Sequence, residues 1–411
     1  MARDGTVWLI CPNCGSEFEA DRMGGCPCCG GILECAYPGH LQAPAPSHGG
    51  SLARYHDRLP VQGPLCSLGE GDTPLVRASR LGGAVGMEAL YLKNEAINPT
   101  GSFKDRGSAI AVTLAQEHGY RGLLTASTGN AAASLAAYCS SQGLDCVVLF
   151  SAGSPLGKLR QALAHGARCV QVEGLFEGEP EAFACVLTAV SEALKLYLGF
   201  FWAPVNPYLI EGMKTIAYET VEQLGGRAPD VVVGPVGGGD GLVGQWRGYR
   251  ELYHAGLIER LPRLIGVQSS GAAPLVRAFE RGEERVGHIA EAHTVASGLQ
   301  VTFSGDHALR AIRESGGAAV AVEDEGILEA QRRLARMEGA WVEPSAAVGV
   351  TALPALLDAG LIGPQERVVC VLTGAGFKDH DHDAVSEGDA AAVGPAVRLD
   401  ADLIEGRISD T

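Results

Sequence analysis

The sequence predicts an α/β fold whose mostly parallel sheets are covered by helices on both faces. From residue 112 onward, apolar runs typical of strands alternate with helical patterns, and this alternation requires crossover connections between parallel strands. Glycine-rich turns follow some of the strand-like runs. The chain has 411 residues, of which 46% are hydrophobic and 19% charged, so it is large enough for about two or three domains with buried cores.

A cysteine-rich segment, residues 8–40, comes first along the chain. Cys11 and Cys14 form one C-x-x-C knuckle, Cys26 and Cys29 form a second, and a glycine follows each knuckle. This spacing predicts a small ribbon in which four thiolates bind a structural zinc ion. The alternatives are a disulfide framework and a knuckle that has lost its metal.

Two further cysteines of this segment, Cys28 and Cys35, could replace one of these ligands. Ribbons of this kind can bind nucleic acid, but residues 15–25 carry three carboxylates against the single basic residue Arg22. A face with that balance of charge repels phosphate backbones. We therefore expect the ribbon to support structure or assembly.

Residues 41–63 are rich in Pro, Gly, Ser and His and show no sustained apolar period. Such a composition predicts a linker or an extended arm. The main folded region would then occupy residues 64–380. The acidic, Ala- and Gly-rich residues 381–411 are expected to form a loosely attached tail.

Within the main region, strands and helices are expected in regular succession. Strand-like runs occupy residues 123–127, 145–150, 168–172, 230–235 and 367–372. Helical patterns occupy residues 108–118, 131–141, 156–165 and 242–254. Active sites in such folds lie beyond the carboxyl ends of the strands, and the polar and glycine-rich loops of this chain fall in those places.

A lysine in the polar stretch 98–107 is the first candidate for chemistry. Lys104 follows turn-forming residues and precedes an amphipathic run. A lysine amine is a poor nucleophile while it is protonated, so a site that uses it must lower its pKa or hold it in an imine. The alternative is a solvated charge or a local ion pair with Asp105.

Two loops at strand ends have the composition of anion-binding sites. Residues 127–131, Ser-Thr-Gly-Asn-Ala, bring small hydroxyls and free amides to a helix N-terminus, which suits a carboxylate. Residues 234–241 place several glycines before a helix, so that N–H groups could converge on a phosphate. Asp240 opposes a dianion there unless its side chain points away. The alternative for both loops is an ordinary strand-to-helix turn without a ligand.

Thr373 lies at the end of the last strand-like run and could face the same crevice. The alternative is a simple turn that ends the strand.

The charge of the chain and the length of its apolar runs argue against nucleic-acid and membrane partners. The formal net charge is −16 and the isoelectric point is near 5.1, so we expect no nucleic-acid partner. No apolar run is long enough to span a bilayer, and the first residues lack the apolar core of a secretory signal. We therefore expect a cytoplasmic protein without a membrane partner.

Several motifs in fixed order reveal a family resemblance. They lie at residues 70–75, 98–107, 127–137, 206–215, 234–241, 343–346 and 372–379, and together they span nearly all of residues 64–380. In this set the chain resembles the threonine synthase branch of fold type II pyridoxal-phosphate enzymes, a group that includes serine/threonine dehydratases and cysteine synthases. An N-terminal zinc ribbon also occurs in some members.

The resemblance implies a tryptophan synthase β-like fold for a catalytic region at residues 64–380. Two three-layer α/β/α domains with parallel-rich sheets would follow the zinc ribbon. The smaller domain would be inserted at about residues 108–204. The resemblance also implies a homodimer.

The resemblance also implies a role for each candidate residue. Lys104 would hold pyridoxal phosphate as an imine, and its amine, once freed by the substrate, would act as a general base. Asn130 would contact the ring hydroxyl, and Thr373 would face the pyridine nitrogen. The cofactor phosphate would lie against Gly237, Gly238, Gly239, Asp240 and Gly241. The substrate carboxylate would bind at Ser127, Thr128, Gly129, Asn130 and Ala131.

The activity implied by the resemblance is that of a lyase that converts O-phosphohomoserine and water into threonine and phosphate. Three positions depart from the usual threonine synthase pattern: Ala131 replaces a hydroxyl residue, the phosphate loop reads Gly-Gly-Gly-Asp-Gly, and Ala375 replaces a histidine. The departures leave room for a relative of threonine synthase that acts on another activated amino acid, and for an alternative activity. It is that of a β-eliminase or β-replacement enzyme similar to serine/threonine dehydratases or to cysteine or cysteate synthases.

Overall fold

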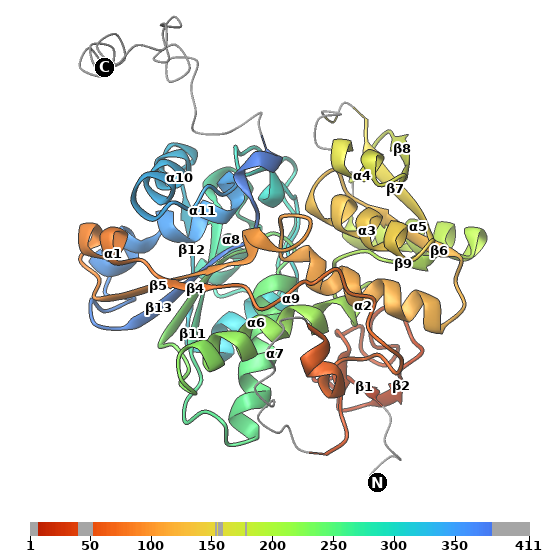
Figure 1. The fold of residues 1–411 in the computed structure, drawn as a ribbon, viewed down its shortest axis with the longest axis horizontal. Coiled ribbons are helices and arrows are strands. Elements are labelled where there is room, and N and C mark those ends of the chain that lie inside the picture. The colour runs from red at the N-terminus through yellow and green to blue at the C-terminus, as the bar shows by residue number, and fades with distance from the viewer. Residues whose placement is uncertain (1–6, 40–51, 153, 155–158, 177–178, 380–411) are drawn as a thin grey trace, which may run out of the picture.

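The structure is a computed structural model that describes residues 7–39, 52–152, 154, 159–176 and 179–379. The tail predicted at residues 381–411 lies outside this part of the chain. The described residues form three sheets and the helices that cover them (Figure 1). None of their helices has the length and apolar character needed to cross a membrane.

The largest sheet has six strands in the order β12-β11-β10-β13-β5-β4. Its strands are β4 (Leu75–Arg77), β5 (Ala89–Asn94), β10 (Val231–Pro235), β11 (Arg263–Ser269), β12 (Ala318–Val322) and β13 (Arg367–Leu372). All neighbouring pairs are parallel except β4 and β5. The central strands are rich in Val, Leu and Ile and are buried, as expected for strands covered on both faces.

A second sheet of four parallel strands has the order β8-β7-β6-β9. Its strands are β6 (Gly122–Ala126), β7 (Asp145–Ser151), β8 (Arg168–Val172) and β9 (Tyr197–Leu198). All four come from inside the range 108–204, although the limits of a separate small domain stay a prediction. The two sheets confirm the predicted α/β class with parallel-rich sheets.

The helices lie between and around these sheets (Figure 1). They are α1 (Ser79–Val85), α2 (Lys104–Glu117), α3 (Asn130–Ser141), α4 (Arg160–Ala164), α5 (Pro180–Leu194), α6 (Leu209–Gln223), α7 (Asp240–His254), α8 (Pro274–Glu280), α9 (Asp306–Glu314), α10 (Asp324–Glu338), α11 (Pro344–Thr351) and α12 (Leu353–Asp358). Short 3₁₀ turns include η1 (Leu52–Arg58), η2 (Glu95–Ile97), η5 (Ser297–Leu299) and η6 (Gly376–Lys378).

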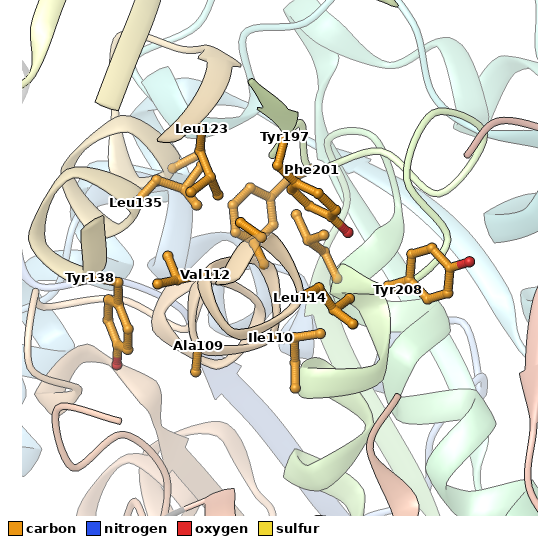
Figure 2. Packing of buried hydrophobic residues seen from close by; sticks show 14 of the residues in the cluster. Ala109, Ile110, Val112, Leu114, Leu123, Leu135, Tyr138, Tyr197, Phe201 and Tyr208 are labelled. Atoms are coloured by element: carbon orange, nitrogen blue, oxygen red, sulfur yellow. The ribbon is translucent and has the colours of Figure 1, made fainter. Parts of the chain in front are cut away.

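Helix α2 differs in two ways from the sequence-based expectation. It begins at Lys104 itself, so the lysine belongs to the first helical turn and not to a loop. Every residue from Asp105 to Ala115 is buried, so the helix has no solvent face over this stretch, where an amphipathic run was expected. The reason is its central position: Figure 2 shows Leu123, Leu135 and Tyr138 on one side of it and Tyr208 on another.

Helices α2 and α6 approach so closely that a glycine is required between them. A Cβ atom built on Gly212 of α6 would lie 2.1 Å from the carbonyl oxygen of Arg106. The motif at residues 206–215 therefore serves helix packing at this position. Its polar side chains add to the contact, because Thr215 accepts a hydrogen bond from Arg106 at 2.8 Å.

Substituting this glycine tests the close packing. Gly212→Ala forces α2 and α6 apart and is expected to lower the free energy of unfolding by about 1–3 kcal/mol or more, measured by urea denaturation. Gly83→Ala is the matched control, because Gly83 lies in helix α1 with open space around its Cα. The control is expected to raise stability by about 1 kcal/mol. Equal effects of the two changes would contradict the packing described here.

The N-terminal ribbon is a three-stranded antiparallel sheet of β1 (Trp8–Ile10), β2 (Glu17–Glu19) and β3 (Glu34–Ala36). Its Leu9 and Leu33 are fully buried in the same apolar cluster as residues of α2 and α6. Within the expected arm at 41–63, η1 places Tyr55 against Tyr218 of α6, with ring centroids 5.2 Å apart. The ribbon is thus packed onto the helical layer that carries Lys104.

Candidate active site

One cavity of about 520 Å³ lies at the carboxyl ends of β6, β10 and β13. The residues that the sequence analysis expected to bind cofactor or substrate line it. They are Lys104, Ser127, Thr128, Gly129, Asn130, Ala131, Gly237, Gly238, Gly239, Asp240, Gly241 and Thr373. The structure therefore brings together groups that are up to 269 residues apart in the sequence, from Lys104 to Thr373.

The turn before Lys104 is fastened to the end of β13. The Phe103 N–H donates to the Thr373 carbonyl oxygen at 3.0 Å, and the Ala375 N–H donates to the Gly101 carbonyl oxygen at 2.9 Å. Gly101 has a φ of +82°, which favours glycine. These bonds place the lysine and the threonine beside the same cavity.

Lys104 is half-buried, with its amine beside two aromatic rings. Its Nζ lies 4.7 Å from the ring centroid of Phe103 and 4.5 Å from that of Phe201. Burial lowers the pKa of Lys104 to about 8, although the carboxylates of Asp240 and Glu343 oppose the shift. The ion pair with Asp105 that was the alternative does not form, because Asp105 accepts hydrogen bonds from Thr100 and Ser134 instead.

The glycine loop after β10 forms a narrow cradle at the N-terminus of α7. A Cβ atom on Gly239 would lie 2.4 Å from the Cβ of Ala308, and one on Gly241 would lie 2.9 Å from the ring of Phe103. Gly239 also has a φ of +105°. The crowding explains the glycines, and the start of a 15-residue helix favours an anion at this point.

The carboxylate of Asp240 is held by two donors on the protein. It accepts hydrogen bonds from the backbone N–H of Ala203 at 3.1 Å and from Nε2 of His307 at 2.9 Å. Burial opposes its ionisation, but the contact with His307 and the charge of Lys104 outweigh burial and lower the pKa of Asp240. The objection that Asp240 raised against a phosphate is reduced only in part, because both donors reach Oδ1 and Oδ2 is buried without a hydrogen-bond partner.

A carboxylate that the sequence analysis did not select also lines the cavity. Both oxygens of Glu343 accept hydrogen bonds from Nδ2 of Asn130, each at 3.0 Å. Glu343 precedes α11 and sits against Gly374, where a Cβ would lie 2.4 Å from Oε1. The sequence signal that could have identified Glu343 is its place in the family motif at residues 343–346. Lys378, which donates to the Thr100 carbonyl oxygen at 2.6 Å, is a second cation of the lining and was likewise not selected.

The residues present fit pyridoxal phosphate. A half-buried lysine, a glycine cradle at a helix N-terminus and a hydroxyl at a strand end surround one cavity. The cradle admits no side chain at Gly239 without a clash. These are the groups needed for an imine link, a phosphate and a ring nitrogen.

The pKa of Lys104 predicts how the apoenzyme takes up pyridoxal phosphate. Because only the neutral amine reacts, the uptake rate is expected to rise about tenfold per pH unit below pH 8 and to level off above it. Glu343→Gln removes a negative charge that raises the pKa of Lys104, so the midpoint should move to lower pH. Stopped-flow absorbance measures both curves. Glu325→Gln, a change at an exposed residue of α10, should leave the midpoint in place. A Glu343→Gln curve with an unshifted midpoint would show that the Glu343 charge does not act on Lys104.

The four knuckle cysteines also meet. The sulfurs of Cys11, Cys14, Cys26 and Cys29 all lie within 4.8 Å of one another. The Cys11–Cys29 and Cys14–Cys26 pairs are 3.5 and 3.6 Å apart, close to the roughly 3.8 Å edge of a tetrahedron with zinc–sulfur bonds of about 2.3 Å. Cys28 and Cys35 are not part of this cluster.

Comparison with known proteins gives a consistent set of relatives. Residues 66–374 match the family described as pyridoxal-phosphate dependent enzymes. The chain is 40% identical to a threonine synthase of Methanocaldococcus jannaschii over 90% of this chain and 93% of that protein. It is 42% identical to a threonine synthase of Mycobacterium tuberculosis over 81% and 89%.

Solved structures show the same arrangement. A threonine deaminase from T.th. superposes with a TM-score of 0.61 at 28% identity, over 74% of this chain and 92% of that one. A maize serine racemase superposes with a TM-score of 0.62 at 20% identity, over 82% and 92%. The second likeness concerns the fold alone.

Proposed function

The chain belongs to the pyridoxal-phosphate dependent enzymes, and from this premise we propose that it converts O-phosphohomoserine and water into threonine and phosphate. It is a pyridoxal-phosphate-dependent lyase of the threonine synthase type. The observation that supports the proposal most strongly is the convergence of Lys104, the glycine cradle, Asn130 and Thr373 on one cavity.

The described residues have distinct binding roles in this proposal. When bound, pyridoxal phosphate supplies an electron-withdrawing ring that stabilises negative charge at the α-carbon of an amino acid. The amides of residues 237–241 and the N-terminus of α7 bind the phosphate. Thr373 offers a neutral hydroxyl to the ring nitrogen, which favours elimination and replacement over transamination. Ser127, Thr128 and the amides of the loop at 127–131 hold the substrate carboxylate.

Lys104 moves the protons. Its neutral amine takes the α-proton of the substrate, and its low pKa leaves a sizeable neutral fraction near pH 8. Removal of a second proton, from the β-carbon, allows phosphate to leave the γ-carbon. The γ-carbon then takes up a proton to become a methyl group, the hydroxyl of water adds at the β-carbon, and the α-carbon regains a proton. One phosphate leaves for each water consumed. The aromatic rings around the lysine limit the access of other water.

Three further features belong to the proposal. The cluster of Cys11, Cys14, Cys26 and Cys29 binds one structural zinc ion. The protein is a homodimer, as its family resemblance implies, and it is located in the cytoplasm. Metal analysis of the purified protein and its mass by light scattering test the zinc content and the oligomeric state separately.

A substrate panel tests the reaction itself. O-phosphohomoserine, O-phosphoserine, O-acetylserine, serine and threonine are each offered to purified enzyme, and phosphate, acetate, ammonia and threonine are measured. Equal amounts of phosphate and threonine from O-phosphohomoserine are expected. Ammonia and an oxo acid from serine or threonine, without that activity, would instead favour the β-eliminase that the loop at 237–241 left open. Release of acetate would favour a β-replacement enzyme.

A further inference from the structure

The ribbon contacts both helices whose first turns build the phosphate cradle. Helix α7 begins with Asp240, which belongs to the cradle, and α9 packs against α7. Each helix carries, farther along, an arginine that reaches the ribbon. These arginines are Arg247 on α7 and Arg310 on α9.

The first turn of α9 supports the cradle directly. The Gly305 N–H donates to the Gly238 carbonyl oxygen at 3.0 Å, and His307 binds the carboxylate of Asp240 at 2.9 Å. Ala308 occupies the space that a side chain at position 239 would need. A shift of α9 would therefore move the wall of the cradle.

One turn later, Arg310 reaches the metal-ligand knuckles. Its Nη1 donates to Oδ1 of Asn13, which lies between Cys11 and Cys14. Asn13 is itself packed against the second knuckle, because a Cβ on Gly31 would lie 2.5 Å from its Nδ2. The position of Asn13 therefore depends on both knuckles being closed around one metal ion.

The contact through α7 is separate from this one. Arg247 donates to the Leu33 carbonyl oxygen at 3.2 Å and to Glu211 of α6 at 2.8 Å. Its Nε lies 3.7 Å from the Glu34 carboxylate. The side chain of Arg247 is 5% exposed. The ribbon therefore helps to shield this charged side chain of α7 from solvent.

From these contacts we propose that the ribbon braces the phosphate cradle, so that metal at the four cysteines and pyridoxal phosphate in the cavity bind cooperatively. The inference rests on the proposed zinc site and goes beyond the proposed reaction. Metal closes the knuckles and fixes Asn13, and Arg310 and Arg247 then fix the first turns of α9 and α7. By thermodynamic linkage the effect is reciprocal: bound pyridoxal phosphate tightens the hold on the metal.

Equilibrium binding tests the coupling without substrate or turnover. Zinc-loaded and zinc-stripped apoenzyme are titrated with pyridoxal phosphate and followed by cofactor absorbance. Stripping is expected to raise the dissociation constant about fivefold or more. In competition with a chelator, the cofactor should tighten zinc binding by the same factor. Equal cofactor affinities, or a protein that binds no zinc, would overturn the inference, whereas the lyase assignment would stand on its own assay.

A matched pair of variants separates bracing from general stability in zinc-loaded protein. Arg310→Met removes the link to Asn13 and is expected to weaken pyridoxal phosphate binding and to reduce its dependence on zinc. Arg313→Met removes the same charge from the same helix, where the guanidinium lies over Phe279, and should change neither. Arg310→Lys should restore part of the coupling. Identical behaviour of Arg310→Met and Arg313→Met would show that the contact transmits nothing.

Discussion

Lys104→Ala is expected to abolish the visible absorption band of the bound cofactor and to lower the rate of threonine formation by about 10³-fold or more. The side chain has two tasks in the proposed reaction, covalent attachment of the cofactor and proton transfer. Its amine lies beside the rings of Phe103 and Phe201 in the cavity lining. Absorbance of the purified variant and the O-phosphohomoserine assay measure the two losses.

Two controls sharpen this result. Lys104→Arg keeps the positive charge but removes the amine, so it should lose the absorption band as completely as the alanine variant. Lys195→Ala removes an exposed lysine at the end of α5 and should leave both signals unchanged. An absorption band that survives in Lys104→Arg would show that another amine binds the cofactor.

Arg106→Met is expected to reduce the free energy of unfolding by about 3–5 kcal/mol. The guanidinium donates to Glu95 at 2.7 and 2.8 Å and to Glu219 at 2.7 Å. All three side chains are fully buried, as is Lys93, which pairs with Glu219 at 2.8 Å. Removal of Arg106 leaves two buried carboxylates with one cation, and this uncompensated charge is the source of the loss.

The dependence on pH identifies that source. Burial opposes ionisation of Glu219, but Arg106 and Lys93 outweigh burial and lower the pKa of Glu219 below its ordinary value of 4.5. In the wild type this stabilisation is present above pH 4.5 and is lost as the pH falls toward the lowered value. Without Arg106 the pKa of a buried glutamate rises, so protonation relieves the variant at higher pH. The difference in stability, measured by urea denaturation, should therefore shrink on acidification.

An exposed arginine serves as the comparison. Arg281 has a side chain that is 68% exposed and lies 3.8 Å from Glu283. Arg281→Met is expected to change stability by only about 0–1 kcal/mol. A loss for Arg106→Met that is equally small, or independent of pH, would contradict the role of buried charge.

Much of the fold could be predicted because its signals are local. The strands at 168–172 and 367–372 were predicted with their observed limits, since short apolar runs between turns mark them clearly. The start of α2 was missed because Lys104 and Asp105 look like loop residues. In the structure Asp105 accepts hydrogen bonds from the nearby Thr100 and from Ser134 of α3, and the second contact, 29 residues away, leaves no local pattern.

The site divides in the same way. Lys104, the glycine cradle and the loop at 127–131 follow strands or precede helices, so their chemistry could be read from their neighbours in sequence. Glu343 acquires its place through Asn130, which is 213 residues away, and Asp240 is bonded to His307, which is 67 residues away. Pairings over such distances leave no local pattern, and their roles in catalysis stay predictions for mutagenesis.

The place of β13 in the large sheet has a consequence for biosynthesis. This strand is the last of the chain within the described residues, yet it lies between β10 and β5 in the middle of the sheet. Its Leu372 pairs with Asn94 of β5. The next residue, Thr373, accepts a hydrogen bond from Phe103 in the turn before Lys104. Pairings of such long sequence separation slow the folding of a chain. A nascent chain therefore cannot assemble its lysine, threonine and cradle until residues 367–372 have been synthesised, and cofactor capture marks completion of the sheet.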